Sequence, residues 1–187
     1  MSKFSLSMIS DKVHIRQALE NEAERVAVFS RRTFYDAFAA FNTPENMDKF
    51  MRGPFSEERL IADFKEAQNF FILALEEEEL LGYVKLIENN VPDLPGQPES
   101  IEISRIYVEN KLTGKGVGQL LMDASIRFAL DKEKKVIWLG VWEHNLRAIA
   151  FYQRLGFEKF SQHDFLLGGD IQNDWLMKKD LQVEKDR

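Results

Sequence analysis

Residues 101–157 read IEISRIYVENKLTGKGVGQLLMDASIRFALDKEKKVIWLGVWEHNLRAIAFYQRLGF, and this stretch decides the fold predicted for the chain. Its pattern predicts a strand, a glycine-rich turn, a helix, a second strand and a second helix. The first helix carries its apolar residues at the i, i+3, i+4, i+7 and i+11 spacing of an amphipathic helix: Val117, Leu120, Leu121, Ala124 and Phe128. The residues that could take part in binding or catalysis lie at the junctions between these elements.

Three alternate glycines, Gly114, Gly116 and Gly118, lie where the first helix is expected to begin. Glycine lets the backbone approach a ligand closely, and the unpaired N–H groups and positive end of a helix favour phosphate. Their spacing matches neither a P-loop nor the G-x-G-x-x-G dinucleotide motif. The turn is consistent with an anion-binding site. Glycines that only mark the start of a helix would give the same sequence pattern.

The strand before this turn changes the phase of its apolar alternation between Ile103 and Ile106. One extra residue in a strand forms a β-bulge, and bulges are frequent beside active sites because they leave backbone groups unpaired. A strand buried on both faces would give the same pattern, so the sequence leaves both interpretations open.

The second helix has an end signal on each side. Asn145 is a good N-cap, and Gly156 lies where a glycine commonly follows a helix. Two helical turns bring Asn145 and Tyr152 to nearly the same face. A capping asparagine and a core tyrosine would explain both residues without any function.

Together these residues resemble the GNAT superfamily of acyl-CoA-dependent N-acetyltransferases over residues 12–180. The family pattern Q/R-x-x-G-x-G/A is matched at Gly116 and Gly118, whereas Thr113 replaces the usual Gln or Arg. The family signature N-x-x-A-x-x-x-Y-x-x-x-G-F is matched in full by Asn145, Ala148, Tyr152, Gly156 and Phe157. The resemblance implies an α/β (α+β) fold with a mixed, mostly antiparallel sheet of six to seven strands, a bulged central strand and flanking helices.

The resemblance also implies acetyl-CoA as co-substrate, direct attack by an amine and no covalent enzyme intermediate. It places the cofactor on Ile106, Tyr107, Val108, Thr113, Gly114, Lys115, Gly116, Val117, Gly118, Gln119, Asn145, Ala148 and Tyr152. Tyr152 is expected to act as the general acid toward the departing thiolate. Glu102, in the strand leading into the bulge, is a candidate general base, although a strand glutamate is often plain surface. Tyr107 is a second candidate for the base.

Three segments resemble more closely the PaiA-type bacterial spermidine/spermine N-acetyltransferases: TFYDAF at 33–38, NTPENM at 42–47 and IWLGVWE at 137–143. This implies a polyamine acceptor, with Tyr35, Asp36, Glu45 and Trp142 as candidate contacts. Solvated surface, helix capping and packing are the alternatives for these side chains. A protein N-terminus or another small amine as acceptor, or a non-catalytic acetyl-CoA sensor, are the alternative functions.

The remaining segments predict the rest of a mixed fold. A strand is expected at 13–18, and helices are expected at 20–40, from Thr43 and from Ser56. Strands at 69–75 and 80–87 flank an exposed glutamate turn, and 89–100 reads as a loop. Two last strands, at 162–167 and 174–179, are joined by Gly168-Gly169.

Composition limits the classes of function. The 187 residues are 44% hydrophobic and 30% charged, which suits one domain at 12–181 with a flexible extension at 1–11 and a frayed tail at 182–187. The absence of cysteine excludes disulfides and thiolate chemistry, and the three histidines show no metal-binding spacing. A net charge of −6 argues against nucleic acid as a partner. With no apolar run long enough to span a membrane and no leader pattern, the cytoplasm is the expected location, and a homodimer is expected from the resemblance.

Overall fold

A seven-stranded sheet forms the centre of the chain, in the order β1-β2-β3-β4-β5-β7-β6. The structure, a computed structural model, describes residues 12–88, 90 and 99–181. The strands are β1 (Val13–Gln17), β2 (Asn69–Glu76), β3 (Glu79–Glu88), β4 (Ser100–Val108), β5 (Val136–Trp142), β6 (Glu158–Leu167) and β7 (Asp170–Asp180). Neighbouring strands are antiparallel except β4 and β5, which are parallel. The expected mixed sheet is therefore confirmed, with seven strands.

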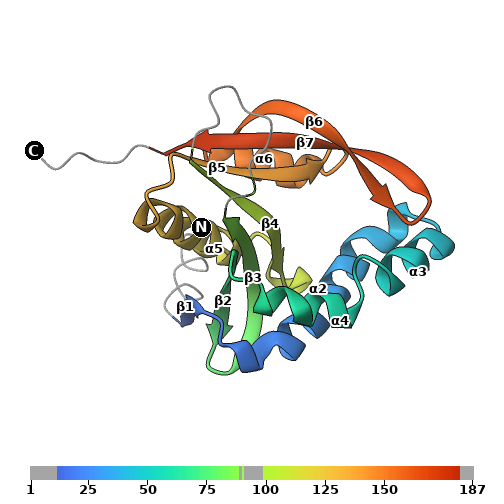
Figure 1. Ribbon diagram of the computed structural model, residues 1–187, viewed down its shortest axis with the longest axis horizontal. Coiled ribbons are helices and arrows are strands. Elements are labelled where there is room, and N and C mark those ends of the chain that lie inside the picture. Colours follow the sequence, from blue (N-terminus) through green and yellow to red (C-terminus); the bar gives the residue numbers. More distant parts are fainter. Residues whose placement is uncertain (1–11, 89, 91–98, 182–187) are drawn as a thin grey trace, which may run out of the picture.

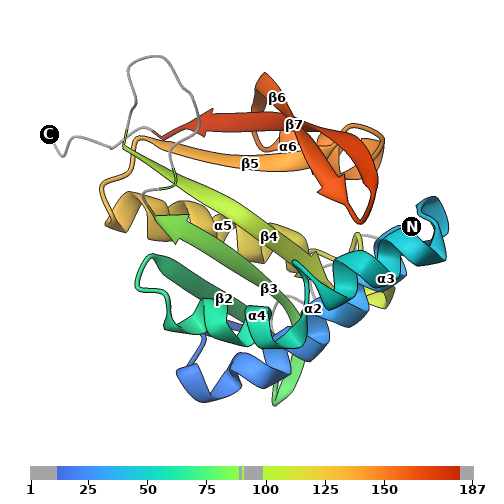
Figure 2. The same ribbon diagram turned by 45° about the vertical axis from the view of Figure 1, so that its right-hand side comes forward.

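Helices cover both faces of this sheet (Figures 1 and 2). They are α2 (Ala23–Phe38), α3 (Pro44–Arg52), α4 (Glu57–Ala62), α5 (Val117–Asp131) and α6 (Leu146–Arg154), with short 3-10 turns η1 (Glu20–Glu22), η2 (Ala39–Phe41), η3 (Asp63–Lys65) and η4 (Asn110–Leu112). Leu121 of α5 and Ile149 of α6 share the main apolar core with Ile137 of β5. The opposite face carries α2 and α4, and α3 lies beneath the tip of the β6–β7 hairpin (Figure 2).

The predicted helix starts are confirmed by their caps. The Thr43 side chain accepts a hydrogen bond from the Asn46 N–H at 3.2 Å, and Pro44 begins α3. The Ser56 side chain accepts from the Arg59 N–H at 3.4 Å at the start of α4. Because each cap satisfies an N–H group that the helix itself leaves free, these polar residues fix where the helices begin.

The sheet opens at its centre, where β4 carries the expected bulge. Ile103 pairs with Leu86 of β3 and Arg105 pairs with Lys85, so Ser104 is the extra residue. β4 pairs with β5 only from Ser100 to Ile103, and beyond this point the two strands diverge (Figure 2). One edge of β4 from Ser104 onward is therefore left without a neighbouring strand.

Several element bounds differ from the expected ones. β6 begins at Glu158 and β7 at Asp170, earlier than predicted, because their first residues are polar and half-exposed or exposed and carry little apolar signal. The helix expected at 20–40 is divided into η1, α2 and η2. The Gly168-Gly169 turn and the exposed glutamate turn are confirmed.

The extension at 1–11, the tail at 182–187 and most of the predicted loop at 89–100 lie outside the described residues. Among the described helices, none combines the length and the apolar character needed to cross a membrane.

Candidate active site

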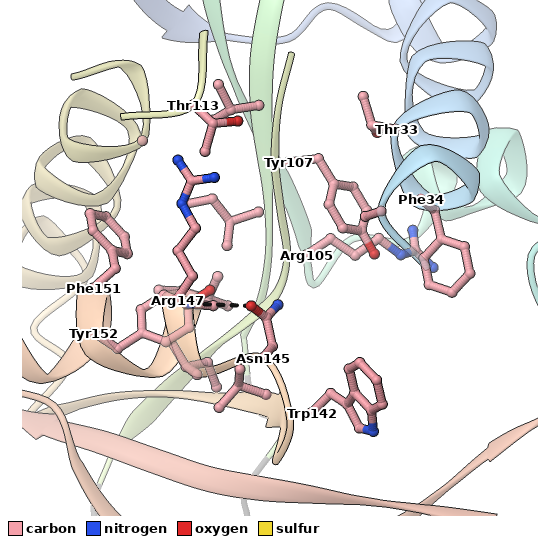
Figure 3. Close-up of a pocket in the computed structure, with 18 of the residues that line it drawn as sticks. Thr33, Phe34, Arg105, Tyr107, Thr113, Trp142, Asn145, Arg147, Phe151 and Tyr152 are labelled. Atoms are coloured by element: carbon pink, nitrogen blue, oxygen red, sulfur yellow. Dashed lines mark hydrogen bonds between the residues drawn. The ribbon is translucent and has the colours of Figure 1, made fainter. Parts of the chain in front are cut away.

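A cavity of about 990 Å³ fills the gap between the diverging strands β4 and β5. Side chains from α2, β4, α6 and the end of β5 face each other across it (Figure 3). Of the residues singled out from the sequence, fourteen line this cavity: Asp36, Ile106, Tyr107, Val108, Thr113, Gly114, Lys115, Gly116, Gly118, Gln119, Trp142, Asn145, Ala148 and Tyr152. The local motifs and the predicted bulge thus meet around one space.

Four of the singled-out residues do not line the cavity. The Val117 side chain is fully buried in the core beneath the turn. Tyr35 is 51% exposed on α2, and the Glu45 side chain is 77% exposed and pairs with Lys49 at 2.9 Å. Glu102 accepts a hydrogen bond from Asn90 at 2.5 Å, and burial raises the pKa of its carboxyl group.

The glycine turn presents unpaired backbone donors to one end of the cavity. Gly114 and Gly116 have φ angles of 81° and 95°, in the left-handed region that favours glycine, and Gly116 is the N-cap of α5. In the described part of the chain, the N–H groups of Gly114 and 116–119 donate to no backbone carbonyl. Because these donors stand at the positive end of a fifteen-residue helix, they can bind an anion.

Arg147 adds a positive charge beside this turn. It lies one residue before Ala148 near the start of α6, and its side chain extends toward Thr113 (Figure 3). Its Nη2 lies 3.5 Å from the position that a Cβ of Gly114 would occupy. Lys115 of the turn also lines the cavity, as does Arg154 from the last turn of α6. This end therefore combines backbone donors with guanidinium and ammonium groups, which suits phosphate.

Tyr152 faces the cavity from the second turn of α6, across from β4 (Figure 3). It is 7% exposed, and burial raises the pKa of its phenol, so the hydroxyl group stays protonated at neutral pH. That hydroxyl group makes no hydrogen bond to any of the described residues. The Asn145 side chain caps α6 by accepting from the Ala148 N–H at 3.2 Å, which holds the helix at this junction. The site therefore contains a buried proton donor without a protein partner.

The opposite wall is formed by β4 and α2. Arg105 follows the bulge and is held by Asp63, with the Nη1 and Oδ2 atoms 2.7 Å apart. The Tyr107 ring packs edge-on against Phe34 and Tyr83, at centroid distances of 6.4 Å and 5.8 Å. Burial raises the pKa of the Tyr107 phenol, which therefore stays neutral and is a poor proton acceptor.

Away from the glycine turn, part of the cavity wall is formed by the β6–β7 hairpin. The Gly169 N–H donates to Asn46 Oδ1 at 2.9 Å, and Gln172 Nε2 donates to Asn42 Oδ1 at 2.7 Å. These bonds tie the hairpin to the first turn of α3 and to Asn42 just before it. Phe165, Gln172 and Asp174 of the hairpin therefore become part of the wall.

Sequence reasoning did not single out several lining residues. Arg105 lies inside the recognised bulge, and Arg147 lies between the recognised Asn145 and Ala148, so both could have been found by reading these motifs residue by residue. Asp174 belongs to a predicted strand without a motif of its own. Only its partners across the sheet bring it to the cavity, with Trp142 on one side and His163 on the other.

Comparisons with known proteins agree with this geometry. The model of the acetyltransferase (GNAT) family matches residues 32–157. An uncharacterized N-acetyltransferase from the pepI 3′ region of Lactobacillus delbrueckii subsp. lactis is 36% identical over 169 residues, which are 90% of this chain and 98% of the relative. The spermine/spermidine N(1)-acetyltransferase of Bacillus subtilis is 34% identical over 64 residues, which are 34% of this chain and 42% of that enzyme.

Among solved structures, the PaiA N-acetyltransferase of Thermoplasma acidophilum in complex with coenzyme A superposes with a TM-score of 0.71. The alignment covers 90% of this chain and 98% of that one at 20% sequence identity. At 20% identity, this similarity shows a common fold and carries no information about the substrate.

Proposed function

Because this chain belongs to the acetyltransferase (GNAT) family, we propose that it transfers an acetyl group from acetyl-CoA to a primary amine. One observation carries the proposal. The free N–H groups at the start of α5, the open edge of β4 and the Tyr152 hydroxyl group lie along one continuous cavity. Acetyl-CoA would bind with its phosphate groups at the glycine turn, and an amine would enter from the opposite end of the cavity. The thioester and the amine would then meet beside Tyr152 and β4.

The glycine turn would hold the phosphate groups of acetyl-CoA. The free amides of Gly114 and 116–119 offer directed donors, and Lys115 and Arg147 supply charge. Loss of the usual Gln or Arg at Thr113 removes a side-chain contact and leaves the backbone donors in place. The turn thus offers the directed donors and the positive charge that such a group needs.

The open edge of β4 would hold the pantetheine arm. Beyond the bulge this edge has no strand partner, and an extended ligand with amide groups can pair with it as an added strand. Ile106 and Val108 contribute through their backbone. The backbone N–H groups freed by the bulge at Ser104 are suited to stabilise the oxyanion that forms when the thioester carbonyl is attacked.

Tyr152 would protonate the departing thiolate. Burial raises the pKa of this phenol and keeps it protonated at neutral pH, so its O–H can donate a hydrogen bond to the sulfur as negative charge develops there. Its lack of any hydrogen-bond partner among the described residues leaves the proton free for this use. No nucleophilic side chain is required, since the amine attacks the thioester directly.

A polyamine is the acceptor that we propose. Two carboxylates, Asp36 and Asp174, line the far half of the cavity, and Trp142 offers an aromatic face to a cation. The partial match to a spermine/spermidine acetyltransferase supports the same class of acceptor.

The test is thiol release from acetyl-CoA by the purified protein, with spermidine, spermine, an N-terminal peptide and an aminoglycoside assayed separately. Release with the polyamines alone is the expected result. Release with the peptide or the aminoglycoside alone would replace the acceptor and keep the chemistry. Binding of acetyl-CoA without release on any amine would contradict transfer and favour a sensor.

A further inference from the structure

Asp174 is a carboxylate in the part of the cavity wall that we assign to the amine acceptor. It lies on β7, half-buried, directly across from Trp142 of β5 and from His163 of β6. Among the described residues its carboxylate has no salt bridge and no hydrogen-bond donor, in contrast to Asp63 and Glu109, which both pair with arginine. Its oxygen atoms are therefore available to a ligand.

Asp174 and His163 converge over Gly140, where the chain has no side chain. An atom placed at the Cβ position of Gly140 would lie 3.6 Å from Asp174 Oδ2 and 3.8 Å from His163 Nε2. His163 is exposed on the edge strand β6, whereas Asp174 lines the cavity. His163 is thus the neighbour of Asp174 on the solvent side of the hairpin.

The surroundings of Asp174 include charged and titratable groups on every neighbouring element. Burial raises the pKa of its carboxyl group, the charge of His163 lowers it, and Glu143 at the end of β5 raises it. On β4, burial and the nearby Asp174 carboxylate both raise the pKa of the Tyr107 phenol, so these two groups share one neighbourhood. The other titratable groups that line the cavity are Asp36 on α2, Arg105 on β4, Lys115 in the glycine turn, and Arg147 and Arg154 on α6.

We infer that Asp174 is the catalytic base that takes a proton from the acceptor ammonium group, and that His163, which lies beside it over Gly140, is a positioning residue that acts through this carboxylate. This inference rests on the proposed acetyl transfer. It supplies a base in the cavity wall, which Glu102 does not line and where Tyr107 stays neutral.

The proton balance requires such a group. An alkylamine with a pKa of about 10.4 has only about one molecule in a thousand neutral near pH 7.5. Asp174 accepts one proton from the ammonium group, and the neutral nitrogen then forms the N–C bond to the acetyl carbon. The C–S bond breaks, and the sulfur takes the Tyr152 proton. The second nitrogen proton restores Tyr152, and the first passes from Asp174 to solvent.

The test compares Asp174→Asn with the matched control Asp164→Asn, which removes an exposed carboxylate from the same hairpin. At pH 7.5 we expect Asp174→Asn to lower kcat/KM for the amine about 100- to 1,000-fold and Asp164→Asn to change it less than about twofold. The kcat/KM of Asp174→Asn should then rise about tenfold per pH unit toward the pKa of the amine, because only the neutral amine reacts.

His163→Gln provides a second signature. Removing the imidazolium charge takes away an influence that lowers the pKa of Asp174, so the acidic limb of the kcat/KM profile should move to higher pH. Spermidine binding, measured calorimetrically without acetyl-CoA, should weaken about tenfold in Asp174→Asn and stay unchanged in Asp164→Asn. A merely structural role would lower activity without changing the shape of either pH profile.

The outcomes separate this inference from the function on which it rests. An active wild-type protein whose Asp174→Asn variant keeps its rate, or loses it equally at every pH, overturns the base and leaves acetyl transfer intact. A wild-type protein that releases no thiol with any amine overturns the proposed function and the proton role with it. The pH-dependent recovery of Asp174→Asn supports both.

Discussion

The two halves of the cavity are built by different means. The half toward α5 and α6 is made by consecutive residues at the starts of two helices, and much of its binding capacity comes from the backbone. The half toward α2, α3 and the β6–β7 hairpin is made by single side chains that lie more than a hundred residues apart, as in the Asn42–Gln172 bond. The first half can be specified by a short motif, whereas the second depends on how distant elements dock.

This difference indicates which half of the cavity can vary in sequence. Backbone donors persist when most side chains change, so the binding of a constant group is robust. A wall of separate side chains can be replaced one residue at a time, and the choice of acceptor can change without loss of the fold. The following variants test this division, starting with the largest expected effect.

Tyr152→Phe should separate chemistry from binding within the first half. We expect kcat to fall about 100- to 1,000-fold because the thiolate loses its proton donor, while the Kd for acetyl-CoA changes less than about threefold. Initial rates and calorimetric binding measure the two effects. Tyr35→Phe, which alters an exposed tyrosine outside the cavity wall, is the control and should retain full activity. Equal losses of rate and affinity would place Tyr152 among binding residues only.

Arg147→Ala should weaken the cofactor and leave the acceptor alone. Loss of an exposed guanidinium group beside the glycine turn should raise the Kd for acetyl-CoA about tenfold, with the difference shrinking as salt is added. The acceptor KM should stay constant. Arg127→Ala removes an exposed charge from α5 outside the cavity and should leave the Kd unchanged. A change confined to the acceptor KM would break the division between the halves.

The same division explains what the sequence could predict. The bulge, the glycine turn and the Asn145 cap are local patterns, and the structure places all three around the cavity as lining or junction residues. Glu45 and Tyr35 were singled out by their place on helices, yet helix position alone does not fix which side chains point inward. Asp174 could not be recognised, because its exposure to the cavity follows from the divergence of β4 and β5 and from pairing between three strands. The pairing register between strands that are distant in the sequence cannot be predicted from any one short segment.

Gly168→Ala should damage the second half selectively. Gly168 has a φ of 66°, and an added Cβ would lie 2.5 Å from the backbone of Asn46, so the hairpin must move away from α3. We expect the free energy of unfolding to fall by at least about 2 kcal/mol and the acceptor KM to rise about tenfold. Acetyl-CoA binding should be retained.

Gly169→Ala is the matched control for this variant. Its added Cβ would lie 3.3 Å from Asn46 Oδ1, a side-chain atom that can shift. Chemical denaturation and acceptor kinetics should therefore show a smaller change than for Gly168→Ala. Loss of acetyl-CoA affinity in Gly168→Ala, with an unchanged acceptor KM, would show that the hairpin supports the cofactor half instead.

Asp36→Asn should have the smallest effect and gives the finest test of the acceptor wall. Asp36 lines the cavity mouth but is exposed, so water and salt screen its attraction for a cationic amine. A contribution of about 1 kcal/mol or less corresponds to a rise in acceptor KM of about two- to fivefold at low salt. Glu45→Gln removes an acid from the next helix, where Glu45 pairs with Lys49 away from the cavity, and should leave the acceptor KM unchanged. If both variants raised the acceptor KM equally, and added salt removed both effects, general attraction by an acidic surface would explain acceptor binding better than a specific wall.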